Sequence, residues 1–106
     1  MFLYSMLLGD TGIIKIGYTN DVHRRATEHG RKFDCRKQVK VLSAIAFNSK
    51  ATVENLETQL IEKIIAAGLK MVVDEQGGVT ERFYINPEVT TVEVTARKKS
   101  YKIVVG

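Results

Sequence analysis

The chain has 106 residues, which is enough for one domain with a modest core and too few for two. Its hydrophobic share of 44% and charged share of 26% are those of an ordinary globular protein and exclude a disordered chain. No apolar run approaches the roughly 20 residues of a membrane span, so we expect no membrane partner. A single cysteine, Cys35, excludes an internal disulfide and a multi-cysteine zinc site and suits a reducing compartment, so we expect a cytoplasmic protein.

The net charge of +4 and the isoelectric point near 9.3 are compatible with a nucleic-acid partner. The cations gather in two segments, 23–40 and 97–102. The first segment carries Arg24, Arg25, Arg31, Lys32, Arg36, Lys37 and Lys40 against only Glu28 and Asp34. Such a run is either a functional basic patch or a solvated surface, and the sequence leaves both interpretations open.

The first third of the chain predicts a hairpin followed by a helix. A strand at 2–8 and a strand at 13–18 flank a turn with two glycines, which favours a hairpin. Gly17 indicates a bulge or a close approach of the backbone to another group. Asn20 or Asp21 is the expected N-cap of a helix over 21–29 that Gly30 closes.

The remainder predicts a third strand at 39–47 and a second helix at 50–67, opened by Asn48 or Ser49 and closed by Gly68. Short extended segments are expected at 69–73, 82–85 and 101–105, with a loop at 74–78. At 86–95 the signals conflict, because Asn86-Pro87-Glu88 is typical of a helix start and the β-branched residues after it favour a strand.

Helical periodicity singles out one carboxylate. Glu57 falls within the apolar stripe of the second helix, which consists of Val53, Leu56, Leu60, Ile61 and Ile64. A carboxylate among aliphatic side chains is costly unless it is paired or binds a metal. Glu57 is therefore a metal ligand, a member of an ion pair, or a rim residue that reaches water.

The same periodicity separates the two neighbouring arginines. Arg25 and His29, four residues apart, lie together beside the inward face of the first helix. Arg24 lies nearly opposite, where Glu28 is an expected partner. In the strands, Lys15 points away from its apolar neighbours toward solvent or a groove, and Tyr4 is a core or rim residue unless it has a catalytic role.

Several short motifs occur in a recognisable order. They are Phe2-Leu3-Tyr4, Lys15-Ile16-Gly17, Arg25 eight residues after Gly17, His29, Glu57, and Glu81-Arg82-Phe83-Tyr84-Ile85. This set resembles the GIY-YIG nuclease superfamily, and the Lys-Ile-Gly form resembles its phage- and virus-associated subgroup. The resemblance covers residues 2–86.

The resemblance implies an α/β (α+β) fold in which helices flank a small central three-stranded antiparallel sheet. It implies a single domain over 1–106 with its core in 2–86 and a basic extension at 87–106. The implied activity is hydrolysis of a DNA phosphodiester bond with one divalent ion, Mg²⁺ or Mn²⁺. Tyr4 then orients or activates the attacking water, Arg25 stabilises the phosphate, Glu57 binds the metal, and His29 matches a frequent histidine of the family.

Two positions depart from the family pattern. Lys15 stands where nucleases of the family have a second tyrosine, and lysine binds phosphate or, when desolvated, loses its proton. Asn86 matches the family's late asparagine only loosely. We therefore keep Lys15 among the expected catalytic residues, with Tyr4 as the residue that orients water.

The sequence thus predicts a metal-dependent DNA endonuclease encoded by a phage or mobile element, acting in the cytoplasm of a bacterial host. The residues expected to contact nucleic acid are Lys15, Arg24, Arg25, Arg31, Lys32, Arg36 and Lys37. Two alternatives keep the fold: a DNA-binding module that does not cut, and a phage protein that binds a host protein. A homodimer is a further expected partner arrangement, because no separate DNA-recognition region is apparent.

Overall fold

The computed structural model describes residues 1–33, 38–73 and 79–106, with residues 79 and 80 described by their backbone. The elements in chain order are β1 (Phe2–Leu8), β2 (Ile13–Thr19), α1 (Val22–Lys32), β3 (Val39–Ala46), α2 (Lys50–Ala66), β4 (Met71–Val73), β5 (Val79–Tyr84), β6 (Thr91–Ala96) and β7 (Lys99–Val104). The expected loop at 74–78 and Cys35 lie outside the described residues. No helix in the described ranges is long and apolar enough to cross a membrane.

The main sheet is larger than the three strands that the sequence predicts. It has five strands in the order β3-β1-β2-β5-β4, and each strand runs antiparallel to its neighbours. The expectation of three strands is wrong because the short segment β5 pairs with β2, with Lys15 opposite Arg82. The three-residue strand β4 then pairs with β5 and ends the sheet.

The helices begin where the capping residues predict. Asp21 accepts a hydrogen bond from the backbone N–H of Arg24 at 3.0 Å, and Ser49 accepts one from Thr52 at 3.3 Å. Gly30 does not close α1, contrary to the prediction, since the helix continues to Lys32 and Phe33 N–H donates to the His29 carbonyl at 2.9 Å. Gly30 keeps a helical backbone conformation, without the positive φ of a glycine that ends a helix, and the ring of Phe33 packs on His29 beyond it.

The predicted C-terminal extension is part of the core. Residues 91–104 form the hairpin β6–β7, whose Val92, Val94 and Ile103 join the main hydrophobic cluster. The β-branched residues thus outweigh the helix-start signal at 86–88. Asn86 instead caps a turn, accepting through its side chain from Glu88 N–H at 3.0 Å and through its carbonyl from Val89 N–H at 2.9 Å.

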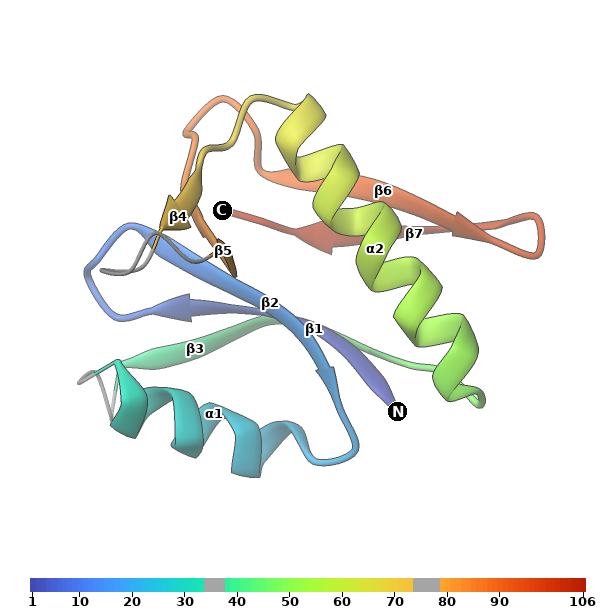
Figure 1. Ribbon diagram of the computed structural model, residues 1–106, viewed down its shortest axis with the longest axis horizontal. Coiled ribbons are helices and arrows are strands. Elements are labelled where there is room, and N and C mark those ends of the chain that lie inside the picture. Colours follow the sequence, from blue (N-terminus) through green and yellow to red (C-terminus); the bar gives the residue numbers. More distant parts are fainter. Residues whose placement is uncertain (34–37, 74–78) are drawn as a thin grey trace.

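The layers follow from these pairings (Figure 1). Helix α1 packs against β1 and β3 on one side, whereas α2 packs against β6 and β2 on the other. Strands β1 and β2 run between the two helices, so side chains from β1, β2, α1 and α2 can meet. The core on the α2 side includes Leu3, Ile14, Ile16, Leu56, Leu60, Ile64 and Phe83.

Candidate functional site

An open pocket of about 340 Å³ lies where β1, β2, α1, α2 and β5 meet. It is lined by Tyr4, Lys15, Ile16, Gly17, Tyr18, Arg25, His29, Lys32, Glu57 and Glu81. The structure therefore brings together all five residues that the sequence predicts as catalytic: Tyr4, Lys15, Arg25, His29 and Glu57. These residues come from four elements spread over more than half of the chain.

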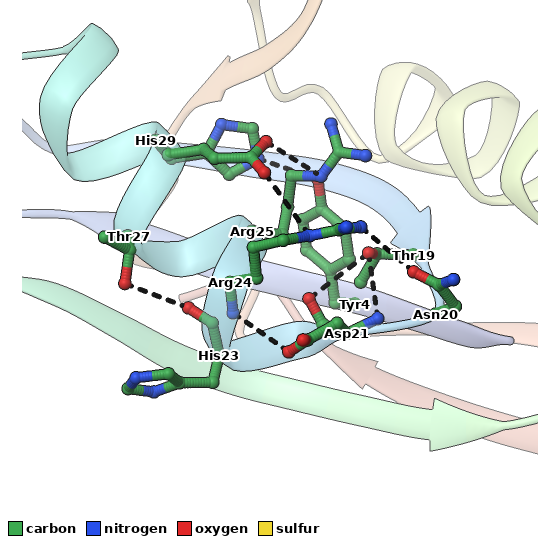
Figure 2. Close-up of polar contacts among 10 residues, drawn as sticks. Tyr4, Thr19, Asn20, Asp21, His23, Arg24, Arg25, Thr27 and His29 are labelled. Carbon is green, nitrogen blue, oxygen red and sulfur yellow. Dashed lines mark hydrogen bonds and ion pairs between the residues drawn. The ribbon is translucent and has the colours of Figure 1, made fainter.

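Tyr4 and His29 form a buried hydrogen bond at the base of this pocket. The Tyr4 hydroxyl lies 2.8 Å from His29 Nε2, and the two side chains point toward each other from β1 and α1 (Figure 2). Tyr4 is 2% exposed and His29 is 6% exposed. The Phe33 ring stacks on His29 with centroids 5.8 Å apart, and the Arg82 guanidinium lies 4.6 Å from the Phe33 ring centroid. His29 is thus held in one orientation.

Burial keeps both members of this pair uncharged at neutral pH. Burial, with the charges of Lys15 and Arg25, lowers the pKa of His29 to about 4. Burial also raises the pKa of Tyr4 above its usual value, and the nearby Arg25 opposes this only in part. A neutral phenol and a neutral imidazole therefore face each other, and their hydrogen bond fixes the hydroxyl of Tyr4.

Gly17 provides the space for Tyr4. A Cβ at position 17 would meet the Tyr4 hydroxyl and would lie 2.7 Å from its Cζ, closer than carbon atoms pack. Gly17 is the Cα partner of Tyr4 across the β1–β2 pair. The close backbone approach that the sequence predicts at Gly17 is therefore confirmed, and the group that approaches is the Tyr4 ring.

Lys15 forms an ion pair with Glu81, a residue that the sequence does not predict as part of the site. Its Nζ lies 3.0 Å from Glu81 Oε2, and the Lys15 side chain is only 15% exposed. Partial burial works against ionisation of Glu81, but the hydrogen bond and charge of Lys15 outweigh it and hold the pKa of Glu81 below its usual value. Lys15 lies on β2 and Glu81 on β5, and the long-range pairing of these strands, with Lys15 opposite Arg82, brings the two residues near each other.

The two neighbouring arginines lie in different surroundings, as the helical periodicity predicts. Arg24 lies on the exposed side, where its Nη2 donates to Asn20 Oδ1 at 3.0 Å and its Nε lies 3.4 Å from Glu28 (Figure 2). Arg25 lines the pocket. Its buried Nε has no hydrogen-bond partner within the described residues, although Glu28 Oε2 lies 3.7 Å away. Arg25 is the better placed of the two to contact an anion in the pocket.

Glu57 faces the pocket from α2, half-buried beside the core residue Leu56. Burial raises the pKa of Glu57, and the charge of Glu81 adds to this, whereas Lys15 opposes it. A half-buried carboxylate that faces an open polar pocket fits a hard cation, because Mg²⁺ keeps several waters and needs few protein ligands. The described residues contain no group of three or more His, Cys, Asp or Glu side chains arranged around a metal.

The other basic residues that the sequence predicts to contact nucleic acid do not all line the pocket. Lys32 lines the pocket, whereas Arg31 is exposed and does not. Arg36 and Lys37 lie outside the described residues. Tyr18 is a lining residue that the sequence did not single out, and its hydroxyl donates to Glu54 at 3.0 Å. Strand alternation places Tyr18 on the same face as Ile14 and Ile16, so the local pattern gives no signal that it lines the pocket.

The fold and this pocket define a small mixed α+β domain with a polar site built from both helices and the main sheet. Residues 2–100 match the family described as the T5orf172 domain, and the chain belongs to that family. This domain occurs in phage and bacterial proteins and is related to nuclease-like folds. Comparisons with curated proteins and with solved structures give no match.

Proposed function

We propose that the protein is a metal-dependent DNA endonuclease of the GIY-YIG type that hydrolyses phosphodiester bonds. The observation that carries this proposal is the pocket that Tyr4, Arg25, His29, Lys15 and Glu57 line together. Phosphodiester hydrolysis needs positive charge on the non-bridging oxygens and a positioned water. The T5orf172 family, with its relation to nuclease-like folds, supports the same proposal.

Arg25 and Lys32 supply positive charge to the phosphate from the α1 side of the pocket. Tyr4 orients the attacking water, because its hydroxyl is fixed by His29 at 2.8 Å. A base with a pKa of about 4 takes up a proton poorly at neutral pH, so His29 orients Tyr4 rather than deprotonating it. Water attacks phosphorus as the bond to the leaving oxygen breaks, and the phosphate stays between Arg25 and Tyr4. Because the pocket is open, the attacking water loses its proton to bulk water and the leaving oxygen takes one from bulk water.

Glu57 is the residue that would hold a divalent cation, Mg²⁺ or Mn²⁺. When bound, that ion supplies Lewis-acid stabilisation of the negative charge that develops on the reacting oxygens. Glu81 is the second carboxylate of the pocket, but its Oε2 already forms an ion pair with Lys15 Nζ, 3.0 Å away. Lys15 therefore neutralises Glu81 and keeps the pocket attractive to an anion.

A plasmid-nicking assay tests this function. We expect the wild type to convert supercoiled plasmid to nicked or linear DNA with Mg²⁺ or Mn²⁺ and to stop on addition of EDTA. Glu57→Gln should lower the rate by about 10²-fold or more, since one charge-stabilising group commonly contributes this much. Glu62→Gln, on an exposed position of the same helix, is the matched control and should cut normally. Equal cutting by both variants would contradict the role of Glu57.

The second candidate function is a DNA-binding module that does not cut. The Lys15–Glu81 ion pair favours this function. Lys15 stands where GIY-YIG nucleases have their second tyrosine, and its ammonium group is already bound to Glu81. Salt-sensitive retention of DNA by a protein that never nicks plasmid would favour this module. A protein that neither binds nor cuts DNA would point to a host protein as the partner.

A further inference from the structure

The hairpin β6–β7 ends in three consecutive cations. Arg97 and Lys98 form the two-residue connection between the strands, and Lys99 is the first residue of β7, opposite Ala96. We call residues 97–99 the basic tip. In Figure 1 the basic tip projects beyond α2, at the end of the hairpin far from the C-terminus.

The basic tip carries uncompensated charge. The four ion pairs in the described part of the chain involve Lys15, Arg24, Arg25 and Lys50, and none includes a residue of the tip. Arg97, Lys98 and Lys99 are all exposed. Three neighbouring cations without carboxylate partners repel one another and attract a polyanion.

The turn geometry is unfavourable for the residues that occupy it. Arg97 has φ 49° and Lys98 has φ 66°, the left-handed region that two-residue hairpin turns require and that Asn-Gly normally supplies. Residues with long side chains adopt this conformation at an energetic cost. Outliers of this kind gather at functional positions, where the side chain matters more than the local strain.

A groove lined by both polar and apolar residues adjoins the basic tip. Two hollows of about 350 Å³ and about 290 Å³ share Thr52, Ala96 and Arg97 among their lining residues. Lys99 and the polar side chains of Asn48, Ser49 and Asn55 line one hollow or the other, and no acidic residue of the described ranges lines either. The groove thus combines cations with hydrogen-bond donors, the combination that binds phosphate oxygens.

We propose that the basic tip and this groove bind the sugar–phosphate backbone of DNA as a second contact, separate from the catalytic pocket. This inference rests on the proposed function in taking DNA as the partner. Helix α2 presents Glu57 to the catalytic pocket and Thr52 to the groove. A helix with its side chains is about 10–12 Å across, comparable with a major groove about 12 Å wide, so one duplex can reach both contacts.

The test is binding of a fluorescein-labelled DNA duplex, measured by anisotropy in EDTA over a range of salt concentrations. We expect the double variant Arg97→Gln/Lys99→Gln to bind several-fold more weakly than the wild type. The slope of log K against log salt should decrease in magnitude by about 2, or about 1 for each phosphate that the variant no longer neutralises. The control is Lys63→Gln/Lys70→Gln, which removes the same charge from exposed positions outside the groove and should bind DNA more tightly than the tip variant.

The variant Lys98→Gly distinguishes weaker DNA binding caused by lost charge from weaker binding caused by lost stability. Glycine relieves the positive φ at this position, so the variant should unfold at a higher temperature than the wild type and still bind DNA more weakly, with a slope reduced by about 1. Equal affinity and salt slope in the tip variants and the lysine control would overturn this inference while leaving the nuclease proposal intact. A wild type that binds DNA without cutting it would contradict catalysis alone, and one that does not bind DNA would overturn both.

Discussion

His29 links the electrostatics of the pocket to the stability of the fold. Its pKa is about 4 in the folded protein and about 6.5 in the unfolded chain, so the unfolded chain binds the proton more readily. The stability that neutral His29 contributes is fully present above pH 6.5 and is lost as the pH falls toward 4. We expect a loss of about 1–3 kcal/mol in the free energy of unfolding over this window.

Urea unfolding of the wild type and of His29→Gln between pH 7 and pH 4 measures this loss. The His29→Gln variant should be less stable at neutral pH and less sensitive to acid than the wild type. His23→Gln, at an exposed position of the same helix, should keep the acid sensitivity of the wild type. The same pH dependence in His29→Gln and the wild type would contradict the buried, neutral histidine.

Gly17 provides a second test at the residue scale. Gly17→Ala places a methyl group against the Tyr4 ring, with Cζ 2.7 Å away, in a region where Tyr4 is fully packed. We expect a destabilisation of about 1–3 kcal/mol by overpacking and, in the nicking assay, a lower rate because Tyr4 shifts away from His29. Gly12→Ala, where the added Cβ meets nothing within 4 Å, should affect stability through its positive φ alone and leave the rate unchanged.

At the scale of elements, the β6–β7 turn tests whether the positive φ of Lys98 costs the fold stability. Lys98→Gly should raise the free energy of unfolding by about 1 kcal/mol, because glycine adopts a φ of 66° without a steric penalty. Lys102→Gly, at an exposed position inside β7, should lower stability instead, since glycine weakens a strand interior. Chemical denaturation of the two variants distinguishes these effects, and a destabilising Lys98→Gly would contradict the strained turn.

The sequence predicts well the elements whose signals are local. Asp21 and Ser49 start the two helices, and the glycine turn at 9–12 joins β1 to β2. The sequence predicts less well the elements that depend on contacts with distant parts of the chain. The strand at 91–96 depends on burial of Val92 and Val94 in the core beside α2, a contact that no local pattern shows. The end of α1 is a different case, because Phe33 stacks on His29, only four residues earlier, and this contact is local.

The same distinction holds at the scale of the whole molecule for the pocket. Helical periodicity correctly separates Arg25 from Arg24, and the apolar stripe around Glu57 singles out a carboxylate that proves to face the pocket. Glu81 is missed as a site residue because its ion pair with Lys15 joins residues 66 positions apart, on two strands that only the fold brings together. The width of the sheet is missed for the same reason.

The central claim is that the pocket between α1 and α2 holds the scissile phosphate, and adjacent arginines of one helix test it directly. The measurement is the single-turnover rate of plasmid nicking by Arg25→Ala and Arg24→Ala with saturating Mg²⁺. Arg25 lines the pocket and Arg24 pairs with Glu28 outside it, so we expect Arg25→Ala to lose about 10²-fold or more and Arg24→Ala to retain most of the rate. Equal rates in the two variants, or a greater loss in Arg24→Ala, would contradict the claim.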